Sequence, residues 1–171
     1  MKVYIKNQQR LIRVNQQRIR SLLRKALRLL GLRRAELSIL FVNDRRMRIL
    51  NRQYRGVDRT TDVLSFPQIE HCSKLSALSS KQFVLGDIII NLHKAKRQAA
   101  EYGLTLDEEL KKLLIHGLVH LLGYNHEKSR HHENKMEKKE KELLDAIGAV
   151  PCVDVKSFEK EKVDNFYFII K

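Results

Sequence analysis

The sequence predicts a single α+β domain, in which about four strands form a mixed sheet packed with helices around one central helix. Two observations support this fold class. Short runs rich in β-branched and aromatic residues alternate with longer segments whose apolar residues recur at helical spacing. The 171 residues are 43% hydrophobic, which is ordinary for a globular chain and enough to bury one core.

The first half of the chain is predicted to hold three strands and two helices, at residues 2–6, 15–30, 36–42, 44–54 and 61–66. Gly31 ends the first helix because glycine adopts the left-handed conformation without strain. Asn43 offers an N-cap for the second helix, which places Met47, Leu50 and Tyr54 on its inner face. Pro67 stops the third strand, since proline has no N–H to donate to a ladder.

The second half begins with a polar, serine-rich stretch at 68–82, which we interpret as an exposed loop. A strand at 83–91 follows, with Asp87 interrupting an apolar run, and then a helix at 92–102. Thr105 and Glu108 form a capping box that opens the central helix. A charged helix at 129–147 completes the predicted domain of residues 1–150, and residues 151–171 form an unassigned C-terminal extension.

The net charge of +14 lies entirely in the first third of the chain. Residues 1–60 contain 17 Lys and Arg against three acids, whereas residues 61–171 contain 17 of each. This asymmetry favours a polyanionic partner, either nucleic acid or an acidic membrane surface, and the alternative is a basic face that only promotes solubility. Two cysteines without a CxxC pattern fit a reducing compartment, and no uncharged run reaches the length of a membrane span, so we expect a cytoplasmic protein without a membrane partner.

Three histidines stand in the most apolar stretch of the chain, residues 113–126, which contains no charged residue. His116 and His120 are four residues apart, so they share one helical face. Gly123 can end the helix and let the chain fold His126 back toward them. Three neutral imidazole nitrogens with one open position suit a single Zn²⁺, and they predict a zinc site rather than three hydrogen-bonded core histidines.

This spacing resembles the motif H-E-x-x-H-x-x-G-x-x-H of the metzincins, a class of zincin-like metallopeptidases, in which the glutamate is the general base. Here Gly117 occupies the glutamate position, which disfavours a metallopeptidase unless a carboxylate such as Asp87 serves instead. A zinc ion with an open position lowers the pKa of its bound water to about 7. Beside a basic surface, the favoured substrate is a phosphodiester, and we select Arg55 as the cation that holds its phosphate.

Residues 116–126 resemble the H-G-x-x-H-L-x-G-[YF]-x-H signature of the YbeY family of rRNA-maturation endoribonucleases. Two further blocks resemble the same family, namely 51–55 continuing through 61–67, and 85–88. The resemblance covers about residues 1–148. It implies a single-strand-specific, zinc-dependent endoribonuclease with the metal on His116, His120 and His126, the family's important arginine at Arg55, and a functional or partner-binding aspartate at Asp87.

The resemblance further implies processing of the 3′ end of small-subunit (16S) rRNA and ribosome quality control. The expected partners are ribosomal RNA, the small ribosomal subunit, ribosomal proteins and a ribosome-associated GTPase. A non-catalytic ribosome-assembly factor with a structural zinc is the main alternative. Structural zinc sites are normally closed by four protein ligands, so that alternative requires a further ligand such as His71 or Cys72.

Overall fold

Strands and helices alternate along the chain in the computed structural model, which describes residues 1–69, 81–124, 130–148 and 151–153. The elements are β1 (Lys2–Asn7), α1 (Gln16–Leu29), β2 (Ala35–Val42), α2 (Asp44–Arg55), β3 (Val63–Pro67), β4 (Phe83–Asn91), α3 (Leu92–Glu101), α4 (Leu106–Leu121) and α5 (Arg130–Ile147). Every predicted strand and helix is present, and the ends differ by one or two residues. Most of the predicted loop at 68–82 lies outside the described residues.

The sheet is mixed and four-stranded, as predicted, with the order β1-β2-β4-β3. β1, β2 and β4 run parallel, and β3 pairs antiparallel with β4 at one edge. The parallel strands β1 and β2 are joined by the crossover helix α1, because parallel neighbours need a long connection. Pro67 is the last residue of β3 rather than the first residue after it, a position that an edge strand tolerates.

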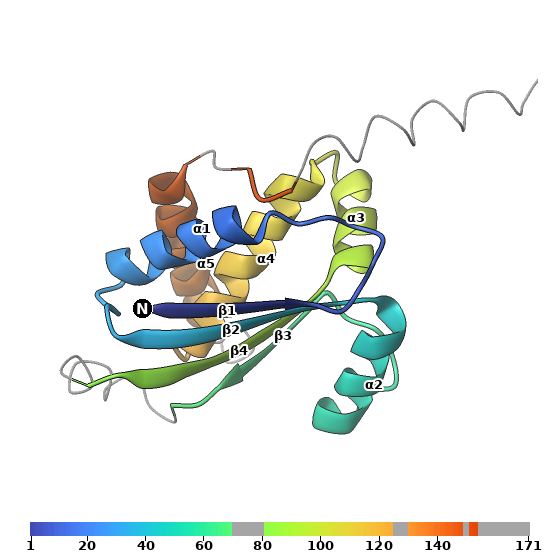
Figure 1. Ribbon diagram of the computed structural model, residues 1–171, viewed down its shortest axis with the longest axis horizontal. Helices are drawn as coiled ribbons and strands as arrows, with labels where there is room; N and C mark the ends of the chain where they lie inside the picture. Colours follow the sequence, from blue (N-terminus) through green and yellow to red (C-terminus); the bar gives the residue numbers. More distant parts are fainter. Residues whose placement is uncertain (70–80, 125–129, 149–150, 154–171) are drawn as a thin grey trace, which may run out of the picture.

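Helices cover the two faces of the sheet unequally. The main core joins α1, α4 and α5 to one face, and we call this the helical face; Figure 1 shows these helices on one side of the sheet. On the other face, α2 packs Met47 and Leu50 against Leu64 and Ile89. The rest of that face is a groove of about 810 Å³, and we call it the open face.

Tyr54 was expected on the inner side of α2, but its side chain is 57% exposed. It nevertheless contacts the sheet, because its ring packs edge-on against Phe66 with centroids 5.0 Å apart. Tyr54 lies at the end of the helix, beyond the small apolar cluster that buries Met47 and Leu50. It therefore lines the groove instead of filling the core.

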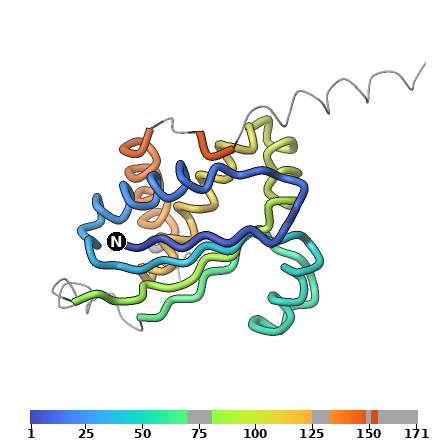
Figure 2. The backbone as a smooth tube through the Cα atoms, viewed as in Figure 1, coloured from blue at the N-terminus to red at the C-terminus, as the bar shows by residue number. Residues whose placement is uncertain are grey.

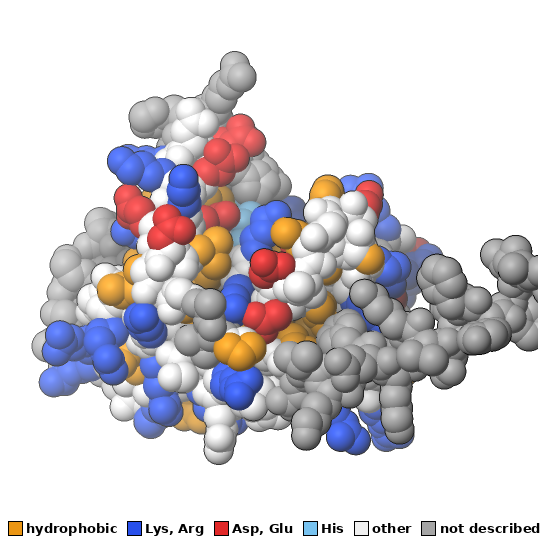
Figure 3. Space-filling model, turned by 90° about the horizontal axis from the view of Figure 1, so that it is seen from above, with side chains coloured by type: hydrophobic (Ala, Val, Ile, Leu, Met, Phe, Trp, Pro, Cys, Tyr) orange, Lys and Arg blue, Asp and Glu red, His pale blue; other side chains and the backbone are white. Residues whose placement is uncertain are grey.

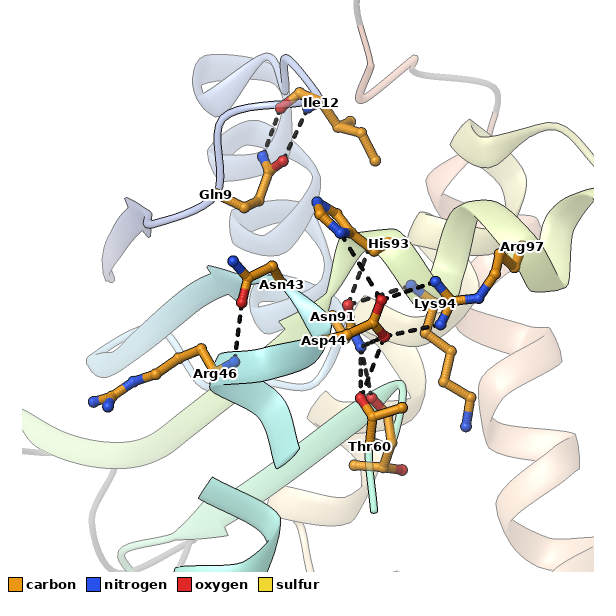
Figure 4. A network of polar contacts seen from close by, with 11 residues as sticks. Gln9, Ile12, Asn43, Asp44, Arg46, Thr60, Asn91, His93, Lys94 and Arg97 are labelled. Carbon is orange, nitrogen blue, oxygen red and sulfur yellow. Dashed lines mark hydrogen bonds and ion pairs between the residues drawn. The ribbon is translucent and has the colours of Figure 1, made fainter. Parts of the chain in front are cut away.

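A buried amide fixes the start of α2 against the start of α3 (Figure 4). The Asn91 side-chain amide donates to Asp44 Oδ1 at 2.8 Å and to Thr60 Oγ1 at 2.9 Å, and Asn91 is fully buried. Arg97 donates two hydrogen bonds to the Asp44 carboxylate, at 2.9 and 2.8 Å. These bonds lower the pKa of Asp44 to about 2. The network fixes where α2 leaves the sheet, and so where its far end lies.

The last described residues pack onto the beginning of the chain. Val153 forms an isolated bridge with Val14, and the Asn15 amide donates to the Cys152 carbonyl at 2.9 Å. Cys152 is fully buried, and its amide donates to the Asp107 carboxylate at the start of α4. Figure 2 shows this segment beside the stretch of chain that leads into α1. None of the helices that the structure describes has the length and apolarity to cross a membrane.

Candidate metal centre on the central helix

α4 carries the motif histidines and begins where the sequence predicts. Thr105 accepts from the Glu108 amide at 3.2 Å, and the Glu108 carboxylate accepts from the Thr105 amide at 2.8 Å, which confirms the capping box. The helix then packs between α3, α5 and the β3–β4 edge of the sheet. Gly123 follows its end with φ of 81°, so the predicted left-handed turn is confirmed.

Gly117 lies where α4 approaches the sheet most closely. A Cβ at this position would stand 2.8 Å from Ile88 Cγ2 and 3.2 Å from Ser65 Oγ. The position thus has no room for a side chain between the helix and the β3–β4 pair. Packing therefore requires a glycine at this position. A glutamate, which serves as the general base of metallopeptidases at the corresponding position, does not fit.

His116 and His120 bring their imidazoles together at the end of α4. Their rings meet edge to face with centroids 4.6 Å apart, and their Nε2 atoms lie 3.1 Å apart. Both residues are half-buried. Two nitrogen ligands of a tetrahedral zinc ion are separated by about 3.3 Å, so the spacing of this pair matches what the ion requires.

The remaining ring nitrogens fix the tautomers of both histidines. His116 Nδ1 lies 2.8 Å from Glu140 Oε1 on α5, and His120 Nδ1 lies 3.0 Å from the Tyr124 carbonyl oxygen. A carboxylate and a carbonyl only accept, so in the neutral imidazoles each Nδ1 carries its hydrogen and each Nε2 presents a lone pair. Two lone pairs that face each other repel unless a proton or a cation lies between them, and the donor set therefore fits a bound metal.

Glu140 is a site residue that the sequence analysis did not select. Its side chain is 16% exposed and lies on the buried side of α5, with Met136, Leu143 and Ile147. These four positions have helical spacing, so a carboxylate stands in the middle of an apolar stripe. That interruption was visible in the sequence and was the available signal for Glu140.

The third predicted ligand, His126, lies outside the described residues, as do the alternative ligands His71 and Cys72. Within the described ranges, no group of three or more His, Cys, Asp or Glu is arranged to hold a metal. The three-histidine zinc site thus stays a prediction, and the structure describes two of its members.

Arg55 and Asp87 lie on the other side of the sheet from the histidines. Successive residues of a strand point to opposite faces of the sheet. Ile88 faces Gly117 of α4, so its neighbours Asp87 and Ile89 point to the opposite face. Asp87 accordingly lines the groove of the open face, together with Tyr54 and Phe66. Arg55 is exposed in the last turn of α2, and Gly56 ends this helix with φ of 69°. The structure brings His116 and His120 together and places Arg55 and Asp87 on elements of the open face.

Comparisons with known proteins agree with this architecture. The family model described as endoribonuclease YbeY matches residues 4–148. The endoribonuclease YbeY of Aquifex aeolicus is 43% identical over 122 residues, which cover 71% of this chain and 77% of the relative. The endoribonuclease YbeY of Syntrophus aciditrophicus is 38% identical over 152 residues, which cover 88% and 92%.

A solution structure of a Thermotoga maritima protein has the same fold, with a TM-score of 0.60 over 85% of this chain and 88% of that protein, at 24% identity. The family match extends from β1 through the end of α5 and includes both histidines of the pair. This chain belongs to the endoribonuclease YbeY family.

Proposed function

We propose that this protein is a zinc-dependent endoribonuclease that cuts single-stranded RNA during maturation of the 3′ end of small-subunit rRNA and in ribosome quality control. Two independent lines support the proposal. The relatives along most of the chain are named endoribonucleases. The observation that carries the proposal is the His116–His120 pair, with its Nε2 atoms 3.1 Å apart and both Nδ1 atoms engaged.

His116, His120 and, as the third ligand, His126 would hold one zinc ion. The ion, when bound, supplies a Lewis acid for the negative charge that develops on a phosphodiester. Glu140 and the Tyr124 carbonyl orient the two imidazoles, so that the nitrogen lone pairs point at one position. Half-burial of the pair restricts water around it while leaving an approach for RNA.

Arg55 and Asp87 take part from the open face. RNA that reaches both the histidines and Arg55 has to pass around β3, the edge strand of the sheet. We therefore assign the Arg55 guanidinium to a phosphate of RNA that flanks the cleaved bond. Asp87, in the groove of the open face, is assigned to RNA positioning or to partner contact.

The proposed partners are rRNA, the small ribosomal subunit, ribosomal proteins and a ribosome-associated GTPase, and the proposed compartment is the cytoplasm. A peptidase is disfavoured, because Gly117 has no room for the glutamate that its mechanism requires. A non-catalytic assembly factor would bind the same RNA through phosphate contacts without cutting it.

The test measures zinc content and RNA cleavage side by side for wild type, His116→Ala and Arg55→Ala. The substrate is a small-subunit rRNA precursor, free or in ribosomal particles. We expect wild type to hold about one zinc ion and to cut. His116→Ala should lose both properties, and Arg55→Ala should keep zinc but cut poorly. Wild-type protein that holds zinc and binds particles without cutting would instead identify an assembly factor.

A further inference from the structure

α1 presents a row of positive charges on the helical side of the molecule. Its buried side consists of Ile19, Leu22, Leu23, Ala26 and Leu27. Its exposed side carries four cations, Arg18, Arg24, Lys25 and Arg28, which we call the basic stripe. The helix contains no acidic residue. In the space-filling view, Lys and Arg side chains gather at the lower left, on the side where Figure 1 places α1, and acidic side chains gather elsewhere (Figure 3).

The basic stripe differs from several other charged surfaces of the protein. On those surfaces a cation meets a carboxylate, as Arg48 does with Asp58 at 2.7 Å and Lys111 with Asp107 at 2.6 Å. On the basic stripe, no ion pair is formed with any part of the chain that the structure describes. Lys25 instead donates to a neutral acceptor, the Ile147 carbonyl at the end of α5.

This arrangement is unfavourable in the protein alone. Arg24 and Arg28 are four residues apart, and Lys25 and Arg28 are three apart, so like charges face each other one turn along the helix. The C-terminal residues 154–171 do not balance the stripe, because they contain four acidic and four basic residues. A polyanion removes the repulsion by contributing negative charge from outside.

The chemistry of the stripe favours a nucleic-acid backbone over a membrane. The apolar side of α1 is closed into the core, with Leu23 and Ala26 fully buried, so the helix has no free apolar face to insert among lipids. The stripe has no aromatic residue on which a base could stack. Without stacking groups beside them, arginine and lysine contact phosphates, and such contacts do not distinguish one base sequence from another. From Arg18 to Arg28 the helix rises about 15 Å, enough to follow several phosphates.

α5 connects the basic stripe to the histidine pair. The carbonyl that Lys25 contacts belongs to Ile147, and Glu140, seven residues earlier on α5, contacts His116. Seven residues of helix span about 10 Å. RNA held on the stripe is therefore within a few nucleotides of the histidines, on the same side of the sheet.

We propose that the basic stripe of α1 is a second RNA-binding surface, which holds the phosphate backbone of structured RNA next to the single strand at the metal centre. The inference rests on the proposed function for the identity of the substrate. The basic stripe contributes affinity for RNA without preference for base sequence, and the metal centre on α4 cleaves the RNA.

The test compares two triple variants of the full chain that remove the same charge. R24Q/K25Q/R28Q neutralises the basic stripe, and K135Q/K138Q/K141Q neutralises three exposed lysines of α5. The probes are a hairpin RNA with a single-stranded overhang and a short unstructured oligonucleotide. Binding is measured by fluorescence anisotropy over a series of KCl concentrations, and circular dichroism checks that each variant is folded.

We expect R24Q/K25Q/R28Q to weaken hairpin binding at least tenfold at low salt. The slope of log K against log salt should decrease by about 2 to 3, because each lost phosphate contact removes just under one unit. Cleavage of the unstructured oligonucleotide should stay within about twofold, since the stripe does not contact the cut. The α5 variant should bind the hairpin nearly as wild type.

Equal losses in the two triple variants would overturn the proposal in favour of general electrostatic attraction. Wild-type hairpin binding by the stripe variant would overturn it directly, as would stripe-dependent binding to phosphatidylserine vesicles with none to RNA. If no protein cuts RNA but only the stripe variant loses hairpin binding, the inference stands and the proposed nuclease activity fails. The variant R18Q/R24Q lowers the charge of the stripe while it keeps Lys25 and its contact with the Ile147 carbonyl, so a folding defect in the triple variant does not prevent a decision.

Discussion

The two faces of the sheet are built in different ways. The helical face is closed: α4 packs so tightly at Gly117 that no side chain fits, and its two histidines have their Nδ1 atoms fixed by neighbouring groups. Among the elements that the structure describes, the open face holds α2 and a groove of about 810 Å³, which Asp87 lines. Rigid support suits a metal centre, whereas an accessible groove suits contacts with other molecules. Sequence blocks that resemble one family signature thus serve two surfaces.

The largest expected effect separates the faces by metal content. His120→Ala removes one of the two described nitrogens, so we expect loss of zinc and a fall in RNA cleavage of about 10³-fold. Asp87→Ala, on the open face, should retain a full complement of zinc. Metal analysis by mass spectrometry and a cleavage assay check both variants. Loss of zinc from Asp87→Ala would show that the faces do not act separately.

A smaller effect tests how tightly the helical face is closed. Gly117→Glu forces a side chain toward Ile88 and should lower the free energy of unfolding by about 3 kcal/mol or more, through overpacking and a buried charge. Ala100→Glu, at an exposed position of α3, is the control and should change it by less than about 0.5 kcal/mol. Urea denaturation measures both. A folded Gly117→Glu protein of wild-type stability would mean that this contact is loose.

The support of the histidine pair can be tested without removing a ligand. Glu140→Gln replaces the carboxylate beside His116 Nδ1 with a neutral amide and should weaken zinc binding about 10- to 100-fold. Glu137→Gln, an exposed residue one turn earlier on α5, provides the matched control. Competition with a chelator gives both affinities. Equal affinities would mean that Glu140 does not support the metal ligand.

The smallest effect concerns the network that positions α2 on the open face. Asp44 has a pKa lowered to about 2, mainly by its hydrogen bonds with Arg97, from an ordinary value of 3.8. A depressed pKa stabilises the fold above the unfolded value, and that contribution is lost as the pH falls from about 4 to about 2. Since the carboxylate is partly exposed, we expect Asp44→Asn to cost only about 1 kcal/mol at pH 7.

The difference between Asp44→Asn and wild type should decrease as the pH falls from about 4 and disappear below about pH 2, where the Asp44 carboxyl is protonated in the folded protein as well. Asp58→Asn removes a more exposed ion pair with Arg48 and should have a smaller effect over the same range. Urea denaturation at several pH values measures both. A constant difference down to pH 2 would assign the effect to packing instead of charge.

The elements were predictable because their signals are local. Asn43 caps α2 through the Arg46 amide, and Thr105 and Glu108 cap α4, as the residues themselves indicate. Which helix covers which face of the sheet was not predictable. Alternation along β4 predicts that Asp87 and Ile88 point in opposite directions, but which helix covers which side depends on the order β1-β2-β4-β3. That order comes from pairing between distant segments, for which no single residue gives a signal.

The same limit applies to the metal centre. The spacing of His116 and His120 predicts a shared helical face, and the structure confirms that they meet. Their orientation depends on Glu140, which comes from another helix 24 residues later. An acidic residue within the apolar stripe of α5 indicates a buried role, but its partner emerges only from tertiary packing.

The contact between Val153 and Val14 bears on where this protein can be shortened. Removing everything after residue 150 would uncover the start of α1, leave the Asp107 carboxylate without the amide of Cys152, and take away two buried side chains. We therefore expect the shortest stable fragment to end at or beyond residue 153. Residues 14–15 and 152–153 are far apart along the chain, yet they bind each other next to the N-terminal end of α4, the helix that carries the histidines.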